Sequence, residues 1–123
     1  MSSLLKITGS DGSQKRNAND FYPTPDSATQ ALLNREYFSV DVWEPACGDG
    51  AISKLLERRN HAVISTDLID YGYGSSGRDF LFEQELLAPD IITNPPFSLA
   101  HEFAQKAIDL GVNKLALLVR LQF

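Results

Sequence analysis

The sequence of 123 residues contains a single cysteine, so it cannot hold an internal disulfide framework. One thiol is typical of proteins from a reducing compartment. Basic residues are outnumbered 11 to 16 by acidic ones, and the formal net charge of −5 gives no overall positive field to attract nucleic acid. The chain opens without a signal peptide, and no apolar run approaches membrane-spanning length. Together these features predict a cytoplasmic protein without a membrane partner.

The length allows one compact domain rather than two. Residues 8–20 are rich in Gly, Ser, Lys, Arg and Asn and show no periodicity. We therefore expect residues 1–20 to form a flexible N-terminal tail. Residues 21–123 are expected to form the folded domain.

Apolar periodicity predicts strands that alternate with helices. Helices are predicted at 25–34, 51–59 and 98–110, and strands at 40–43, 61–66, 90–93 and 114–121. Thr24 is the expected N-cap of the first helix, because Pro25 suits the first helical position and Asp26 the first turn. The Gly- and Ser-rich residues 71–78 predict a loop, and residues 79–81 begin an ambiguous segment. This alternation predicts an α/β fold, an open and mostly parallel sheet of the Rossmann type with flanking helices.

The turn at residues 44–50 joins a predicted strand to a helix and contains Gly48 and Gly50. These glycines permit a ligand to approach the backbone closely, and the N-terminus of the helix favours a negative group. Asp67 ends the next strand about twenty residues on, where a carboxylate can accept hydrogen bonds from ribose hydroxyls. A ribose-containing cofactor is predicted, and these residues leave a nicotinamide or S-adenosylmethionine open. The third glycine of a dinucleotide fingerprint is absent, which disfavours the nicotinamide.

The tetrapeptide Asn94-Pro95-Pro96-Phe97 directly follows a predicted strand. Two prolines have fixed φ angles and no N–H donors, so they force a rigid, extended corner. The corner presents an amide side chain, backbone carbonyls and an aromatic ring, a set that suits a planar substrate with an NH₂ group. Ligands of parallel α/β sheets lie beyond the carboxyl ends of the strands, where the strand order reverses. If the first and third strands are neighbours there, this corner and the turn at 44–50 face one cleft.

At these residues the chain resembles class I S-adenosylmethionine-dependent methyltransferases, and most of all the N6-adenine DNA methyltransferases of phages and prophages. Residues 44–50, Glu-Pro-Ala-Cys-Gly-Asp-Gly, look like the cofactor loop of that family, and Asn94-Pro95-Pro96-Phe97 looks like its catalytic tetrapeptide. Residues 21–25, Phe-Tyr-Pro-Thr-Pro, resemble the segment that meets the methionine end of the cofactor. Asp79-Phe80 resembles the pair that holds the adenine. The resemblance covers residues 20–123.

The resemblance implies S-adenosyl-L-methionine as the cofactor and a set of residues that bind it. These residues are Tyr22, Thr24, Glu44, Ala46, Gly48, Gly50, Asp67, Asp79 and Phe80. Glu44 would lie near the amino group of the methionine part, Thr24 would meet its carboxylate, and Asp67 would bind the ribose. Asp79 would bind the adenine amino group, and Phe80 would stack on the ring or offer its backbone N–H.

The resemblance also implies the reaction, a methyl transfer catalysed by Asn94, Pro95, Pro96 and Phe97. The Asn94 side-chain oxygen and the Pro95 carbonyl would accept the two hydrogens of an exocyclic adenine nitrogen, which localises its lone pair. Phe97 would stack on the base, which is flipped out of a DNA duplex. The sulfonium methyl group is activated by its charge, so no metal is expected and Cys47 is assigned no nucleophilic role. The implied partner is DNA in a bacterial or phage-infected cell.

Three other functions stay open. The tetrapeptide also occurs, usually ending in tyrosine, in N5-glutamine protein methyltransferases, and N4-cytosine DNA methyltransferases usually have serine at its first position. The chain could instead be a non-catalytic fragment that binds the cofactor or a partner. It stops just after the apolar residues 115–119, where complete domains of the family continue. We therefore expect the C-terminal part of the domain to be missing and its edge strand to be covered by a second copy or a partner chain.

Overall fold

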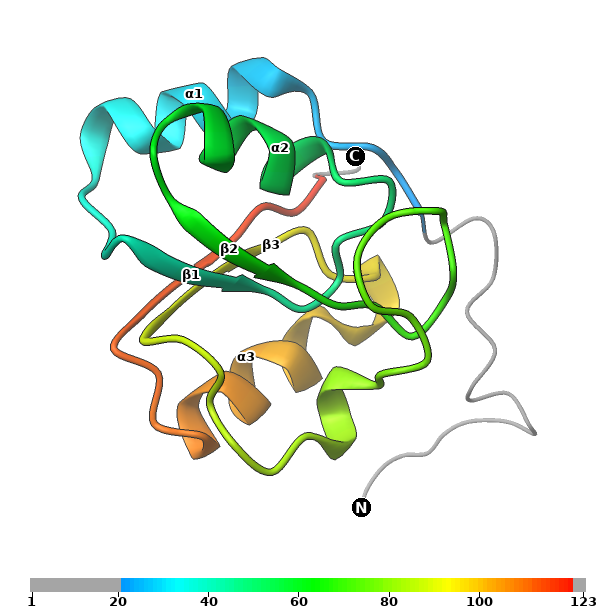
Figure 1. The fold of residues 1–123 in the computed structure, drawn as a ribbon. Helices are drawn as coiled ribbons and strands as arrows, with labels where there is room; N and C mark the ends of the chain where they lie inside the picture. The colour runs from blue at the N-terminus through cyan, green and yellow to red at the C-terminus, as the bar shows by residue number, and fades with distance from the viewer. Residues whose placement is uncertain (1–20, 121–123) are drawn as a thin grey trace.

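The computed structural model describes residues 21–120, so the predicted tail at residues 1–20 lies outside the described part. Figure 1 shows helices on both faces of a central sheet. The elements in chain order are helix α1 (Asp26–Arg35), strand β1 (Asp41–Glu44), helix α2 (Ala51–Arg58), strand β2 (Ala62–Ser65), the short 3₁₀ helix η2 (Phe80–Phe82), strand β3 (Asp90–Thr93), the 3₁₀ helix η3 (Phe97–Leu99), helix α3 (Ala100–Asp109) and strand β4 (Lys114–Leu117).

The four strands form one sheet in the order β2-β1-β3-β4, and every pair is parallel. The chain runs outward from β1 to β2, then crosses to β3 on the other side of β1 and runs outward again to β4. The strand order therefore reverses between β1 and β3, where Trp43 pairs with Ile91. The predicted parallel α/β sheet is confirmed, and so is the expectation that the first and third strands are neighbours.

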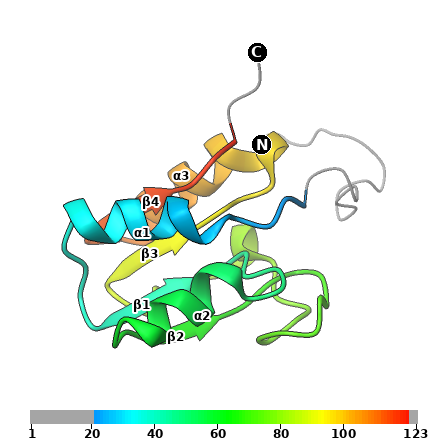
Figure 2. The same ribbon diagram turned by 90° about the horizontal axis from the view of Figure 1, so that it is seen from above.

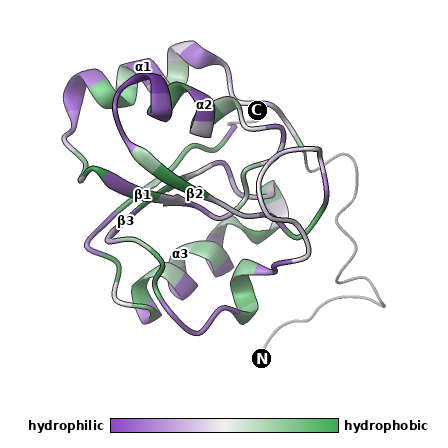
Figure 3. Cartoon of the chain, viewed as in Figure 1, coloured by the Kyte–Doolittle hydropathy of each residue, from purple (hydrophilic) through white to green (hydrophobic). Residues whose placement is uncertain are grey.

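Successive side chains of each strand point to opposite faces of the sheet, and this alternation builds two cores. Trp43 and Ile91 belong to the core under η2 and α3, together with Phe103. Val42 and Ile92, their neighbours in sequence, belong to the core under α1 and α2. In Figure 2, α2 lies over β1 and β2 while α1 lies over β3 and β4. In Figure 3, α1 is largely hydrophilic in colour, as expected for a helix with one side in water.

A buried carboxylate ties the loops at the amino end of the sheet. Asp90, which is 1% exposed, begins β3. One of its oxygens accepts a 2.7 Å hydrogen bond from the backbone N–H of Ser39, just before β1. The other accepts a 3.2 Å hydrogen bond from the side-chain amide of Asn113, just before β4. Asp90 therefore fixes the entries of three adjacent strands.

The first helix and the first strand begin one residue later than predicted. The predicted N-cap Thr24 is wrong, because Pro25 holds the N-cap position in an extended conformation with φ −67° and ψ 143°. The Pro25 carbonyl accepts the hydrogen bond from the Ala28 N–H that closes the first turn. Val40 was predicted in the first strand but precedes it, and its side chain is 64% exposed.

The last two predicted elements also differ from the structure. The helix predicted at 98–110 begins as η3, in which the Pro96 carbonyl accepts a tight hydrogen bond from the Leu99 N–H, and continues as α3. The strand predicted at 114–121 ends at Leu117 in the structure. Residue 121, the last of the predicted strand, lies outside the described part. The final bond to β3 joins the Leu118 N–H to the Thr93 carbonyl. Beyond Thr93 the prolines offer no N–H, so the ladder stops.

No helix within residues 21–120 is long and apolar enough to cross a membrane.

Candidate functional site

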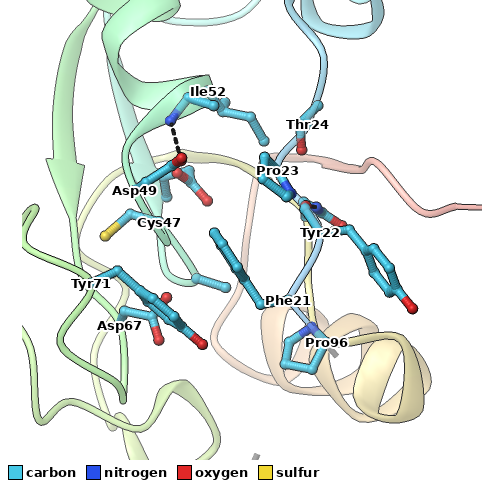
Figure 4. Close-up of a pocket in the computed structure, with 14 residues that line it drawn as sticks. Phe21, Tyr22, Pro23, Thr24, Cys47, Asp49, Ile52, Asp67, Tyr71 and Pro96 are labelled. Carbon is cyan, nitrogen blue, oxygen red and sulfur yellow. Dashed lines mark hydrogen bonds between the residues drawn. The ribbon is translucent and has the colours of Figure 1, made fainter. Parts of the chain in front are cut away.

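A pocket lies at the carboxyl ends of β1 and β3, the point where the strand order reverses. Figure 4 shows its lining, which comes from four separate segments of the chain. The lining residues are Phe21, Tyr22, Pro23, Thr24, Glu44, Ala46, Cys47, Asp49, Ala51, Ile52, Asp67, Tyr71, Asn94 and Pro96. Both the turn after β1 and the turn after β3 contribute, so the two face one pocket as expected.

The turn after β1 is fixed to the end of β2. The Gly48 N–H donates a 2.9 Å hydrogen bond to Oδ2 of Asp67, whose carboxylate is buried. The other oxygen of Asp67 accepts from the backbone N–H of Ile69. Gly48 has φ +56° and Gly50 has φ +90°, so both occupy the left-handed region that favours glycine. This turn therefore holds the Asp67 carboxylate at the pocket wall.

Glu44 is a buried carboxyl group at the end of β1, and it also lines the pocket. The Thr93 hydroxyl donates to its Oε2 at 2.7 Å, and the Ser53 hydroxyl donates to its Oε1 at 3.1 Å. Burial raises the pKa of Glu44 to about 8, and repulsion from Asp67 acts in the same direction against those two hydrogen bonds. Glu44 is therefore mostly protonated at pH 7 in this structure.

The turn after β3 is fixed to the segment before α1. The Nδ2 of Asn94 donates a 2.6 Å hydrogen bond to the main-chain carbonyl of Tyr22. The Tyr22 ring in turn lies beneath the guanidinium group of Arg120, 4.3 Å from it. Pro95 and Pro96 are buried, whereas the Phe97 ring is 52% exposed. The turn is thus rigid at its base and presents an aromatic ring to solvent.

Most of the predicted site residues lie together. Tyr22, Thr24, Glu44, Ala46, Asp67, Asn94 and Pro96 line the pocket. Gly48 and Gly50 belong to the same turn as Ala46, and Pro95 and Phe97 belong to the same turn as Asn94, although these four residues are not among the lining residues.

Asp79 and Phe80 are the predicted residues that the structure places elsewhere. The Phe80 ring is 1% exposed and packs edge-on against Trp43, with ring centroids 5.2 Å apart. The prediction that this ring stacks on adenine is wrong, because the core covers it; the alternative role of the Phe80 N–H remains a prediction. The carboxylate of Asp79 accepts a 3.0 Å hydrogen bond from the Leu81 N–H and so caps η2.

Several lining residues were not predicted as site residues. Phe21 and Tyr71 stack on each other, with ring centroids 4.4 Å apart and an angle of 17° between the planes. Asp49 accepts a 3.2 Å hydrogen bond from the Ala51 N–H at the start of α2. The buried thiol of Cys47 lies 3.5 Å from the Tyr73 carbonyl, and burial raises its pKa to about 12, which disfavours the thiolate form. Tyr71 could have been suspected as the first aromatic residue after Asp67.

The pocket contains carboxyl groups, but no described residues are arranged as a metal site. Within residues 21–120, no group of three or more His, Cys, Asp or Glu side chains is placed to hold a metal ion.

No protein-family model matches this chain, and a search of curated proteins finds none similar to it.

Proposed function

We propose that this protein transfers a methyl group from S-adenosylmethionine to an exocyclic amino group, above all N6 of adenine in DNA, on a class I methyltransferase fold. The observation that carries the proposal is the position of Asn94. Its amide lies in one pocket with Glu44 and Asp67, at the switch point of a parallel sheet. Asn94, which suits an amino group, therefore lines the same pocket as Asp67, which suits ribose hydroxyls, and Glu44, which suits an ammonium group.

The chemistry of the pocket fits the proposed cofactor. The Asp67 carboxylate suits ribose hydroxyls, because it lines the pocket and a carboxylate is an acceptor of hydrogen bonds. Glu44 suits the ammonium group, because a neighbouring cation lowers the pKa of a carboxyl and stabilises its charged form. At Gly48, an added Cβ would lie 2.5 Å from Cε1 of Phe21, so the space that this glycine leaves is taken up by the Phe21 ring. When bound, S-adenosylmethionine supplies a methyl group made electrophilic by the adjacent sulfonium.

The turn after β3 would act on the acceptor. The Tyr22 carbonyl holds Nδ2 of Asn94, which turns Oδ1 away from that carbonyl and makes it the accepting end of the amide. Asn94 Oδ1 and the Pro95 carbonyl accept the two hydrogens of the amino group, so its lone pair localises on nitrogen. The exposed ring of Phe97 offers a stacking face for the base. The amino nitrogen gains the methyl group and loses one proton to water.

The proposed nucleic-acid partner needs local positive charge, because the chain as a whole carries −5. Arg120 supplies such a charge next to the Asn94 turn, through its contact with the Tyr22 ring. A guanidinium group at this position suits a phosphate of the strand that carries the target base.

Methyl transfer from radiolabelled S-adenosylmethionine tests the proposal. The acceptors are unmethylated DNA with adenine, DNA with cytosine but no adenine, and a glutamine-containing peptide. Label in the adenine DNA alone is the expected result. Label in cytosine DNA or in the peptide would assign one of the other amino acceptors. Cofactor binding by calorimetry without transfer to any acceptor would make the chain a cofactor-binding protein, and the proposed catalysis would be wrong.

A further inference from the structure

The pocket is too small for a nucleoside as the chain stands. The cavity among the lining residues has a volume of about 30 Å³, whereas sites for ligands of cofactor size measure about 300–1,000 Å³. A lining side chain must therefore move before such a ligand can enter. The side chains of Glu44 and Asp67 are buried and held by hydrogen bonds from neighbouring segments, so they are poor candidates for that movement.

Phe21 is the lining side chain whose movement would open the pocket. It is only half-buried, and it lies outside regular secondary structure. In Figure 4 the Phe21 ring extends into the pocket beside Tyr71 and near Asp67. Cε1 of Phe21 lies 2.5 Å from the position that a Cβ on Gly48 would take. The space that glycine leaves open is therefore filled by the Phe21 ring.

The space beside Gly48 that the Phe21 ring fills, called the slot below, suits the heteroaromatic ring of a nucleoside. One wall is the face of Tyr71, already paired with a nearly parallel ring at 4.4 Å. The floor is the backbone of Gly48, whose N–H binds the Asp67 carboxylate, so an acceptor for ribose hydroxyls lies next to the slot. A purine is flat and stacks on aromatic side chains as a phenyl ring does.

We propose that Phe21 occupies the slot in the free chain, and that the heteroaromatic ring of a nucleoside ligand displaces it and stacks on Tyr71. This inference rests on the proposed function for its ligand, S-adenosylmethionine. Tyr71 is then a residue that sets specificity for an aromatic base, and Phe21 is its internal competitor. The exchange also reaches the catalytic turn, because the neighbouring Tyr22 carbonyl holds the Asn94 amide.

Calorimetry of the full chain with S-adenosylmethionine, adenosine and methionine tests the exchange. Phe21→Ala removes the competitor and is expected to bind both adenosine compounds more tightly than the wild type. Tyr71→Ala is expected to bind them about tenfold more weakly, as the loss of one stacking contact implies, and Tyr71→Phe is expected to bind like the wild type. Tyr37→Ala, which removes a ring that is 94% exposed, is the matched control and should bind these ligands with the affinity of the wild type. Amide NMR spectra of each variant establish that it is folded.

The outcomes separate the two proposals. If Phe21→Ala binds as weakly as Tyr71→Ala, Phe21 is a permanent wall of the site and the exchange is wrong. If all variants bind S-adenosylmethionine equally, the exchange is wrong and the cofactor stands. If adenosine binds with the expected pattern and S-adenosylmethionine does not, the exchange stands and the cofactor is wrong. If neither the wild type nor Phe21→Ala binds either adenosine compound, both proposals fall.

Discussion

The side-chain amide of Asn94 is held at 2.6 Å by the main-chain carbonyl of Tyr22, a residue 72 positions earlier in the chain. The bond joins the segment before α1 to the turn after β3. Because the carbonyl takes the donor end of the amide, it fixes which atom of Asn94 is available to accept. Orientation of this group does not depend on the turn alone.

Asn94→Ala is predicted to lower methyl transfer by at least about 100-fold, the effect of removing one oriented hydrogen-bonding group from a transition state. Affinity for S-adenosylmethionine should stay unchanged, because the proposed contacts to it come from other residues. Transfer is measured with radiolabel and affinity by calorimetry. Asn34→Ala, at an exposed position in α1, is the control and should keep full activity. Turnover that survives the loss of Asn94 would refute the role given to its amide.

Gly48→Ala is predicted to destabilise the fold through two separate effects. The left-handed conformation costs a residue with a Cβ about 1–2 kcal/mol, and the new methyl group would also meet the Phe21 ring. Gly111→Ala is the matched control, since Gly111 has φ +86° but nothing within 4 Å of the added Cβ. Urea unfolding should show a larger loss for Gly48→Ala than for Gly111→Ala.

The contact between Gly48 and Phe21 can be isolated in a double-mutant cycle. In a Phe21→Ala background the added methyl group has space, so the excess loss at Gly48 should disappear. The expected coupling is about 0.5–3 kcal/mol, the range for residues in direct contact. Equal losses in both backgrounds would mean that the Phe21 ring does not rest on Gly48.

Glu44 is predicted to make the fold less stable as the pH rises from about 5 to about 8. The folded chain keeps the Glu44 proton up to a pKa of about 8, whereas the ordinary value is 4.5. Between these values the folded state binds more protons than the unfolded state, so this contribution falls with rising pH, by at most about 1.4 kcal/mol per pH unit. It is fully present below the lower pKa and lost once the pH has passed the upper one.

Urea unfolding of Glu44→Gln at several pH values tests this contribution. Glutamine stays uncharged, so the variant should lose the downward slope between pH 5 and pH 8 that the wild type has from Glu44. Glu102→Gln, at an exposed position in α3, should keep that slope. Parallel curves for the wild type and Glu44→Gln would show that the carboxyl group is not protonated at neutral pH.

Phe80→Ala is predicted to lower the free energy of unfolding by about 3–5 kcal/mol, because it removes a ring from the packed core. The ring contacts both Trp43 and Phe103. Phe82→Ala removes a ring that is 80% exposed and should change stability by at most about 0.5 kcal/mol. The milder variant Phe80→Leu keeps the core filled and should bind S-adenosylmethionine like the wild type. Weaker binding by a stable Phe80→Leu variant would mean that the Phe80 ring does take part in cofactor binding.

The fold could be predicted largely because its signals are local. The strand Asp90–Thr93 was predicted with its observed bounds, since an apolar run ends there at two prolines. The positions of Glu44 and Asp67 at strand ends also follow from the chain order, because parallel strands bring their carboxyl ends to one edge. Asn94 follows for the same reason.

What could not be predicted depends on contacts between distant segments. Thr24 has the right residue type for an N-cap, but its side chain lines the pocket and the helix begins after Pro25 instead. Phe80 has the right position for an adenine contact, but the core between the sheet and α3 takes its ring. The stacking of Phe21 on Tyr71 joins two loops, and no periodicity marks either residue.

Substitutions at the two ends of β3 are expected to have different effects. Asp90 at its first position anchors the loops before β1 and β4, while Asn94 directly after its last position belongs to the pocket. A library of substitutions along this strand should therefore yield insoluble or degraded chains at one end and folded, inactive chains at the other. Screening the library in parallel for soluble expression and for ligand binding would show which positions are needed for folding and which for the proposed chemistry.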